Sequence, residues 1–173
     1  MAVAEHCPGL TSLGVSGCWD LTDASVVAVA KHCPGLTGLV VNGCNNLTDA
    51  SVLAVAKHCP VLTGLDVSSC KNLTDASVVA VAEHCPGLTS LVGANSLDTY
   101  KAILNATLTT FKPINSSAVT DESLLTVIKR CPGLTSLDFS NCKNLTDASV
   151  LAVAEHCPGL TSLNVHYLSL IHI

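Results

Sequence analysis

Hydrophobic residues along the chain follow two spacings that alternate regularly. In the run Leu10-x-x-Leu13-x-Val15 the apolar residues have the spacing of a half-buried β-strand. A polar Thr22-Asp23 pair follows, and residues 24–32 then carry apolar side chains at helical spacing. Thr22 is a natural N-cap, and the proline after Cys33 cannot continue a helix. Each such segment therefore predicts a strand, a helix and a turn.

The whole segment repeats, and the ten cysteines show its period most simply. Cys33, Cys59 and Cys85 are 26 residues apart, and a second cysteine follows the first two of these after 11 residues. A fixed period in this range indicates a solenoid of stacked units. We expect strands to start at Leu10, Leu36, Leu62, Leu88, Leu108, Leu134 and Leu160.

These starts predict an array of about seven units over residues 1–167. The segment 88–107 is a shortened, irregular unit, and 108–133 is a degenerate one. Pro113 counts against a strand in the degenerate unit, because proline has no N–H to donate to a neighbouring strand.

A strand, a crossover helix and a second strand give a parallel sheet with right-handed connections. Helices are bulkier than strands, so a stack of such units curves. We therefore expect the α/β fold class, as a right-handed solenoid that forms a horseshoe arc. Its short parallel strands lie on the concave face and its helices on the convex face.

The pattern L-x-x-L-x-L-x-x-C-x-x-L-T-D resembles the leucine-rich repeat in its cysteine-containing, 26-residue subtype. Its positions are filled by Leu10, Leu13, Val15, Cys18, Leu21, Thr22 and Asp23. The subtype is similar to the repeat region of F-box proteins, which recognise substrates in SCF-type ubiquitin ligases. No F-box-like segment precedes the repeats in this sequence.

Composition narrows the classes of function. With eight Lys and Arg residues and a formal net charge of −5, the chain has no basic footprint for nucleic acid. The mean hydropathy is +0.51, but no segment approaches the ~18 uninterrupted apolar residues of a membrane span. We interpret the cysteines as buried structural residues, and a disulfide framework is the rival interpretation. Equivalent cysteines of adjacent units should point the same way, which is unfavourable for a disulfide bond between them. Buried free cysteines suggest a reducing compartment, so we expect an intracellular protein, cytoplasmic or nuclear.

Two kinds of chemistry are suggested by residue type but not by spacing. A His-Cys pair, such as His32-Cys33, recurs along the chain, but the C-x-x-C spacing of structural zinc sites is absent. Serine, histidine and aspartate recur in every regular unit at scaffold positions, whereas a catalytic triad needs one unique nucleophile. We therefore predict no enzyme, no catalytic residue, no metal site and no cofactor.

The units differ from one another at the outward strand positions and in the turn after each strand. Keeping a scaffold constant while varying one face is how a repeat protein displays a binding surface, although unselected drift would also vary exposed positions. The partner-binding residues that we predict on the concave face and its rim are Trp19, Val40, Asn42, Asp66, Ser68, Lys71, Asp138, Ser140, Lys143 and Asn164.

A non-enzymatic module that binds a protein partner is thus the first interpretation. The second is the substrate-recognition part of an F-box ubiquitin ligase. The third is a small-molecule or polyphosphate sensor, for which the mixture of Lys71, Lys112 and Lys143 with Asp66 and Asp138 is poorly suited.

The first six residues match the end of a repeat helix, whereas the last six depart from the repeat. No capping unit shields the stack, so end-to-end self-association is an expectation. Residues 168–173 are a non-repeat tail, LSLIHI, which resembles the translation of a transposase adaptor and suggests an artefact.

Overall fold

The computed structural model describes residues 6–94, 107–113 and 119–166. The predictions made for the tail 168–173 and for most of the short unit 88–107 lie outside the described residues. The strands are β1 (Ser12–Gly14), β2 (Gly38–Val40), β3 (Gly64–Asp66), β4 (Ser90–Ala94), β5 (Thr110–Pro113), β6 (Ser136–Asp138) and β7 (Ser162–Asn164). The helices are α2 (Asp23–His32), α3 (Asp49–His58), α4 (Asp75–His84), α6 (Asp121–Arg130) and α7 (Asp147–His156).

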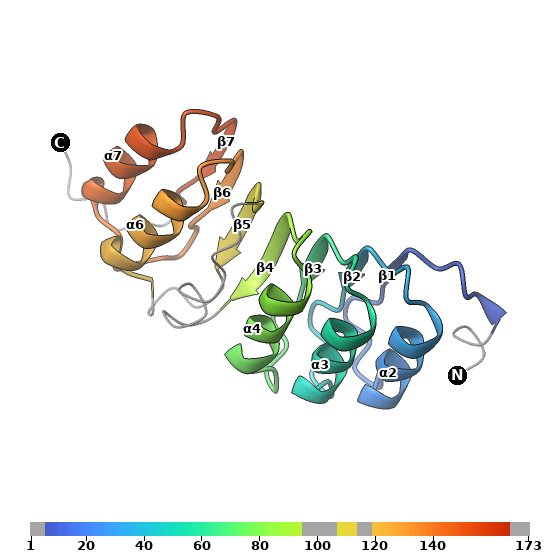
Figure 1. Ribbon diagram of the computed structural model, residues 1–173. Helices are drawn as coiled ribbons and strands as arrows, with labels where there is room; N and C mark the ends of the chain where they lie inside the picture. Colours follow the sequence, from blue (N-terminus) through green and yellow to red (C-terminus); the bar gives the residue numbers. More distant parts are fainter. Residues whose placement is uncertain (1–5, 95–106, 114–118, 167–173) are drawn as a thin grey trace.

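The seven strands form one parallel sheet in which their order is the order of the sequence. Leu13 pairs with Leu39, which pairs with Leu65, so neighbouring strands are in register with the repeat. Helices follow the strands along one side of the sheet (Figure 1). This is the predicted solenoid arc of alternating parallel strands and helices.

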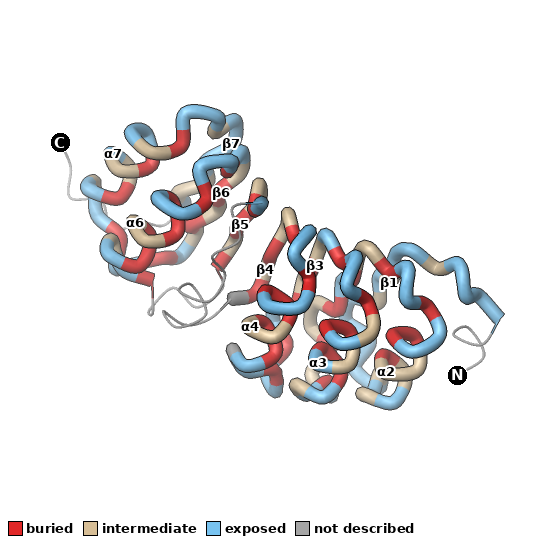
Figure 2. Tube along the Cα trace, in the orientation of Figure 1, coloured by how far each residue is buried: buried red, intermediate tan, exposed pale blue. Residues whose placement is uncertain are grey.

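The core lies between the sheet and the helices. The inward residues Leu39, Leu65, Leu91, Phe111 and Leu137 are each at most 2% exposed. Helix valines meet them from the other layer, and buried segments therefore run along the strands and the inner helix faces (Figure 2). Valine is a poor helix former, so this packing is what stabilises the helices.

The unit-to-unit contacts include a continuous series of threonine hydrogen bonds at the start of the strands. Each threonine hydroxyl donates to the backbone carbonyl of the equivalent threonine in the preceding unit, for example Thr37 to Thr11 at 2.9 Å. The series continues to Thr161, and it includes the bond from Thr109 to Thr89 at 3.2 Å. The aligned threonines lie 20 residues apart at that point and 26 elsewhere.

Several of the buried cysteines are hydrogen-bond donors as well as apolar core residues. Cys44 and Cys70 each donate through Sγ to a carbonyl of the preceding unit, at 3.0 Å. Cys59 does the same from the end of a helix, to the carbonyl of Cys33 at 3.6 Å. Burial, together with the nearby Cys85 and Cys33, raises the pKa of the Cys59 thiol to about 11, which keeps the proton in place. Eight of the ten cysteines are buried, as the structural interpretation predicts, whereas Cys7 and Cys18 are exposed.

The first aspartate of helices α2, α3 and α6 ties each of these helices to the next unit. Asp49 accepts the backbone N–H of Thr74 at 2.8 Å and its hydroxyl at 2.6 Å. Asp23 accepts the same two bonds from Thr48. Thr74 and Thr48 are the N-caps that the sequence predicts, but the bonds between units were not predicted.

Two of the helix-entry aspartates, Asp49 and Asp121, make stability depend on pH. Partial burial raises the pKa of Asp49, but the bonds from Thr74 and Ser77 lower it by more, so it lies below the ordinary 3.8. The pKa of Asp121 is lowered in the same way: partial burial raises it, and bonds from Ser149 and Thr146 outweigh that effect. A lowered folded-state pKa gives stability that is present above pH ~3.8 and lost as the pH falls through the folded value.

We therefore expect the melting temperature of the wild-type protein to fall more between pH 5 and pH 3 than that of an Asp49→Asn, Asp121→Asn variant. The reason is that only the wild type has these two carboxylates to protonate. Circular dichroism at a series of pH values measures this. Asp20→Asn, at an exposed turn position, is the control for the removal of a carboxylate. Parallel curves for the wild type and the double variant would contradict the assignment.

The residue before each turn cysteine has a left-handed backbone. Gly17, Gly43, Ser69 and Asn141 occupy this position, with φ between 59° and 72°. Gly35 and Val61, in the turn after a helix, are not left-handed, as the presence of valine predicts.

Replacing Ser69 with glycine should stabilise the protein by about 0.5–1 kcal/mol, because a side chain is unfavourable in this conformation. The reverse change, Gly43→Ser, should destabilise it by a similar amount. A Cβ at Gly43 would meet no atom closer than 3.8 Å, so that variant tests the backbone effect alone. Chemical denaturation measures both, and opposite signs are required.

The junction between β4 and β5 departs from the regular pattern. The register shifts between Val92 and Ala94, and Gly93 has φ +120°. In regular units the N–H after the strand donates to the next strand, as Val41 does to Asp66 at 2.9 Å. Pro113 has no such N–H, and the paired register of β5 with β6 ends at Phe111. Pro113 therefore shortens the pairing but does not prevent the strand.

Candidate binding surface

One row of outward side chains crosses the concave face of the sheet. Parallel pairing in register places Gly14 beside Val40, Val40 beside Asp66, and Asp66 beside Val92. The row continues through Lys112 and Asp138 to Asn164. Val40, Asp66, Asp138 and Asn164, which the sequence predicts as partner-binding residues, thus share one row.

The acidic members of this row also shape the backbone after the strand. Oδ1 of Asp66 accepts the N–H of Ser68 at 2.9 Å, and Oδ1 of Asp138 accepts the N–H of Ser140 at 3.0 Å. Asn164 accepts the N–H of His166 at 3.2 Å in the same way. Aspartate and asparagine commonly hydrogen-bond their own backbone two residues on. The spacing Asp-x-Ser is the sequence signal for this role, which sequence reasoning missed.

Ser68, which the sequence predicts as a partner-binding residue, is buried and so is not available for direct contact. Ser68 is 8% exposed, and its hydroxyl donates to Asp66 while accepting the side-chain amide of Asn42 at 2.6 Å. Ser140 is half-buried and its hydroxyl donates to Asp138. These serines fix the carboxylates beside them, so they act on the surface through Asp66 and Asp138.

The two aspartates of the row differ in their second oxygen. Oδ2 of Asp138 forms an ion pair with Nζ of Lys112 at 2.6 Å. Burial raises the pKa of Asp138, but Lys112 and Ser140 lower it by more, so it lies below its ordinary value. Asp66 lies between Val40 and Val92 instead, and its Oδ2 has no partner within the part of the chain that the structure describes.

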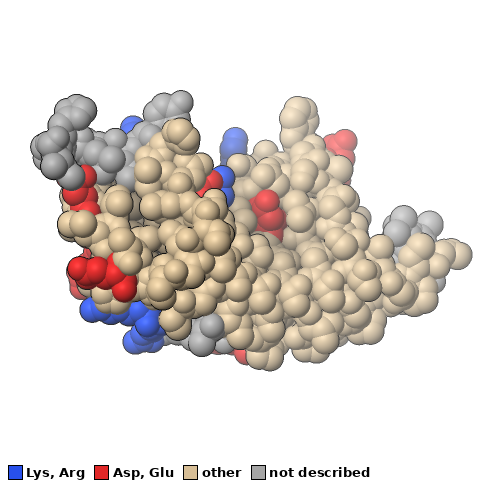
Figure 3. All heavy atoms as spheres, turned by 90° about the horizontal axis from the view of Figure 1, so that it is seen from above, with Lys and Arg blue, Asp and Glu red and all other residues tan. Residues whose placement is uncertain are grey.

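A shallow hollow of about 240 Å³ opens beside Asp66 on this face. Glycines form part of its floor, because Gly38 and Gly64 occupy the outward position that carries Ser12, Ser90 and Ser136 in other units. The lining residues are Gly38, Leu39, Val40, Gly64, Leu65, Asp66, Ser90 and Val92. In the view from above, most of the visible surface is uncharged and acidic atoms lie near its middle (Figure 3). The unit-to-unit change from serine to glycine is the signal that could have predicted the hollow.

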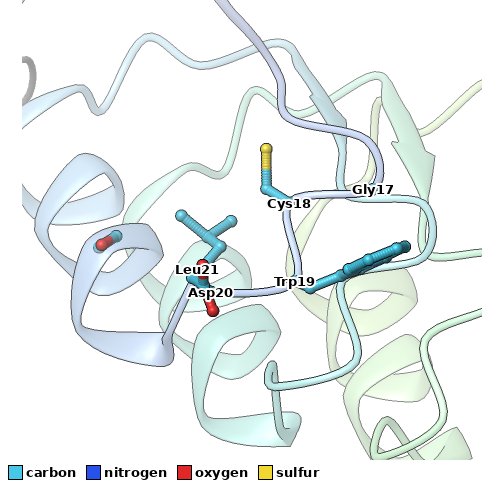
Figure 4. Close-up of a pocket in the computed structure, with 6 residues that line it drawn as sticks. Gly17, Cys18, Trp19, Asp20 and Leu21 are labelled. Carbon is cyan, nitrogen blue, oxygen red and sulfur yellow. The ribbon is translucent and has the colours of Figure 1, made fainter.

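The predicted rim residues lie on the turns after the strands. Trp19 is 72% exposed, and Lys71 and Lys143 are exposed at the equivalent position. Trp19 borders a separate open hollow of about 520 Å³ with Gly17, Cys18, Asp20, Leu21 and Ser25. Its indole ring points away from Leu21 (Figure 4). Trp19 does not line the hollow beside Asp66, so the predicted residues fall into a strand row and a turn rim.

No metal site is apparent in the described ranges, where no three His, Cys, Asp or Glu side chains gather to hold an ion. Within the same residues, no helix has both the length and the apolar character needed to cross a membrane.

Comparison with known proteins supports the fold. The family model described as "Leucine Rich repeat" matches residues 58–82 and 130–154. No curated protein sequence is significantly similar to the chain. The leucine-rich repeat-containing protein LegL7 from Legionella pneumophila superimposes with a TM-score of 0.54 at 15% identity, over 91% of this chain and 57% of that one. At this identity the likeness concerns the fold alone.

Two further solved structures are similar at a lower level. A chain of the yeast Rad7 and Elc1 complex gives a TM-score of 0.48 at 15% identity, covering 94% of this chain and 58% of that one. Actin-binding site 2 of leiomodin-1 gives 0.48 at 15% identity, covering 91% and 84%. The chain thus spans less than two thirds of the Rad7–Elc1 and LegL7 chains.

Proposed function

Because the chain is a leucine-rich repeat protein, we propose that it is a non-enzymatic module that binds a protein partner through the concave face of its sheet. Repeats of this kind typically bind proteins and are usually non-catalytic. The observation that carries the proposal is the row from Gly14 to Asn164, which changes in charge and size from strand to strand on an otherwise regular scaffold.

The regular positions already have structural partners. The threonines at the strand starts, the buried cysteines and the helix-entry aspartates make hydrogen bonds to the neighbouring unit. By contrast, Val40 is 37% exposed and lies beside the half-buried Asp66. Constant side chains thus maintain the array, and the variable ones are available to a partner.

Site-specific photo-crosslinking tests the proposal. A benzophenone amino acid at Val40 should crosslink to a partner protein, whereas the same group at Leu53, exposed on helix α3, should not. Preferential crosslinking from Leu53 would contradict the proposal.

Once a partner is captured, the combined substitutions Trp19→Ala, Asp66→Asn and Asp138→Asn should lower the affinity for it by tenfold or more, a loss of ~1.4 kcal/mol or greater in binding free energy. Asparagine keeps the backbone bond, as Asn164 shows at the equivalent position, so the charge is removed without removing the turn. Isothermal titration calorimetry measures the affinity, and Lys57→Ala with Glu83→Ala on the helices is the control. Unchanged affinity in the concave variant would sink the proposal.

Two narrower proposals depend on sequence outside this chain or on its ends. A role as the substrate-recognition part of an F-box ubiquitin ligase requires an F-box elsewhere in the protein, which the full coding sequence would reveal. End-to-end self-association would join the outer edges of β1 and β7, which have no neighbouring strand among the described residues. A molecular mass that rises with concentration in light scattering tests the second.

The sensor interpretation has the weakest support of the three. The residues beside the hollow include Asp66 but no cation, and Lys112 is already paired with Asp138. An anionic ligand would therefore meet a carboxylate.

A further inference from the structure

The carboxylate of Asp66 is held in place, but no cationic side chain pairs with it among the described residues. Ser68 fixes its Oδ1 through both the backbone N–H and the hydroxyl, and Asn42 in turn bonds to that hydroxyl. Oδ2 has no partner among the described residues. A carboxylate fixed by its own turn is prepared to accept a cation, because little further ordering is needed on binding.

Another unit of the protein contains the kind of ion pair that Asp66 lacks among the described residues. At the equivalent position three strands away, Lys112 reaches across from the preceding strand and meets Oδ2 of Asp138 at 2.6 Å. The residue that precedes Asp66 in the row is Val40, which offers apolar surface but no charge. Asp66 and Asp138 therefore occupy equivalent positions, but the preceding strand offers Asp66 a valine where it offers Asp138 a lysine.

The space beside Asp66 has the size and lining for one side chain. The hollow of about 240 Å³ is smaller than the ~300–1,000 Å³ typical of small-molecule pockets. Gly38 and Gly64 leave its floor open, and Val40 and Val92 lie on either side of Asp66. The aliphatic stem of a lysine or arginine packs well on apolar surface while its charged end reaches a polar group.

We propose that this hollow is a subsite for a lysine or arginine side chain of the protein partner. The stem lies over Gly38 and Gly64 against Val40 and Val92, and the charged end binds Oδ2 of Asp66. The inference rests on the proposed function and deepens it, because it states which part of the concave face binds which kind of side chain. The net charge of −5 also favours the approach of a basic segment of the partner.

A random peptide library displayed on phage, selected on the purified 173-residue chain, tests the subsite. Selected peptides should share a lysine or arginine. Their affinity, measured with synthetic peptides by fluorescence anisotropy, should fall about tenfold for Asp66→Asn, the loss expected for one hydrogen bond to a charged group.

Val40→Lys provides a second, independent variant. Its ammonium should pair with Asp66 as Lys112 pairs with Asp138, and so compete with the peptide for the same carboxylate. Leu53→Lys is the matched control, because it adds the same charge on an exposed helix position. We expect at least a tenfold loss for Val40→Lys and none for Leu53→Lys, at unchanged melting temperatures.

The outcomes separate the subsite from the wider proposal. The subsite proposal is overturned if the selection yields no basic peptide, or if Asp66→Asn does not lower the affinity of the basic peptides. If Asp138→Asn or a substitution of Asn164 lowers that affinity instead, binding to the concave face still stands. If no substitution on the concave face lowers the affinity and substitutions on the helices do, the result counts against both proposals.

Discussion

Replacing Gly93 with alanine should destabilise the protein by about 3 kcal/mol, from ~1–2 kcal/mol of left-handed backbone strain and ~1–3 kcal/mol of overpacking. Gly93 has φ +120°, and a Cβ there would lie 2.5 Å from Cγ2 of Val67 and 3.0 Å from its carbonyl carbon. The methyl group of Val67 could rotate away, but its backbone could not move without disturbing the pairing of β3 with β4. For a chain of this size, the melting temperature should fall by about 6–12 °C.

Gly64→Ala is the matched control for this prediction. Gly64 is also a strand residue of the concave face, but its φ is not positive and a Cβ there would meet no atom within 4 Å. Thermal melts of the two variants should therefore differ by several degrees. Equal melting temperatures would mean that the β4–β5 junction tolerates a side chain, and that its irregular backbone is not required.

Truncating Phe111 to alanine should cost about 3–5 kcal/mol, the usual range for a buried phenylalanine. Phe111 is 2% exposed and pairs in register with Leu91 on one side and Leu137 on the other. It occupies a position where the other units have leucine, so Phe111→Leu should cost less than ~1.5 kcal/mol. Urea denaturation of both variants measures the difference, and a Phe111→Ala variant no less stable than Phe111→Leu would show that the cavity collapses without cost.

The fold could be predicted from the sequence because the same spacing occurs several times. One strand pattern, Leu10 to Val15, would be weak, but its recurrence at Leu36 and Leu62 fixes the unit and hence the parallel sheet. Contacts between units were not predicted. The bonds from Thr74 to Asp49 join residues of adjacent units, and only the three-dimensional stacking brings them together.

Strand alternation predicts which strand residues point outward from the core, but it does not show what surrounds each of them. The outward positions of Val40 and Asp66 follow from alternation, whereas Ser68 is buried and its hydroxyl bonds to Asp66 and Asn42. The unlike surroundings of Asp66 and Asp138 depend on which residue occupies the neighbouring strand. That comparison needs the register across strands, and a list of variable positions does not supply it.

The threonine series at the strand starts has a mechanical consequence. It passes through the β4–β5 junction unbroken, by the bond from Thr109 to Thr89. Among the helices that the structure describes, α2 packs on α3, α3 on α4, and α6 on α7. The described residues on the two sides of the junction are thus joined through the strands, by the pairing of β4 with β5 and by this threonine bond. A force that pulls the two ends of the array apart therefore acts directly on the strand-to-strand hydrogen bonds of this junction, including the bond from Thr109 to Thr89.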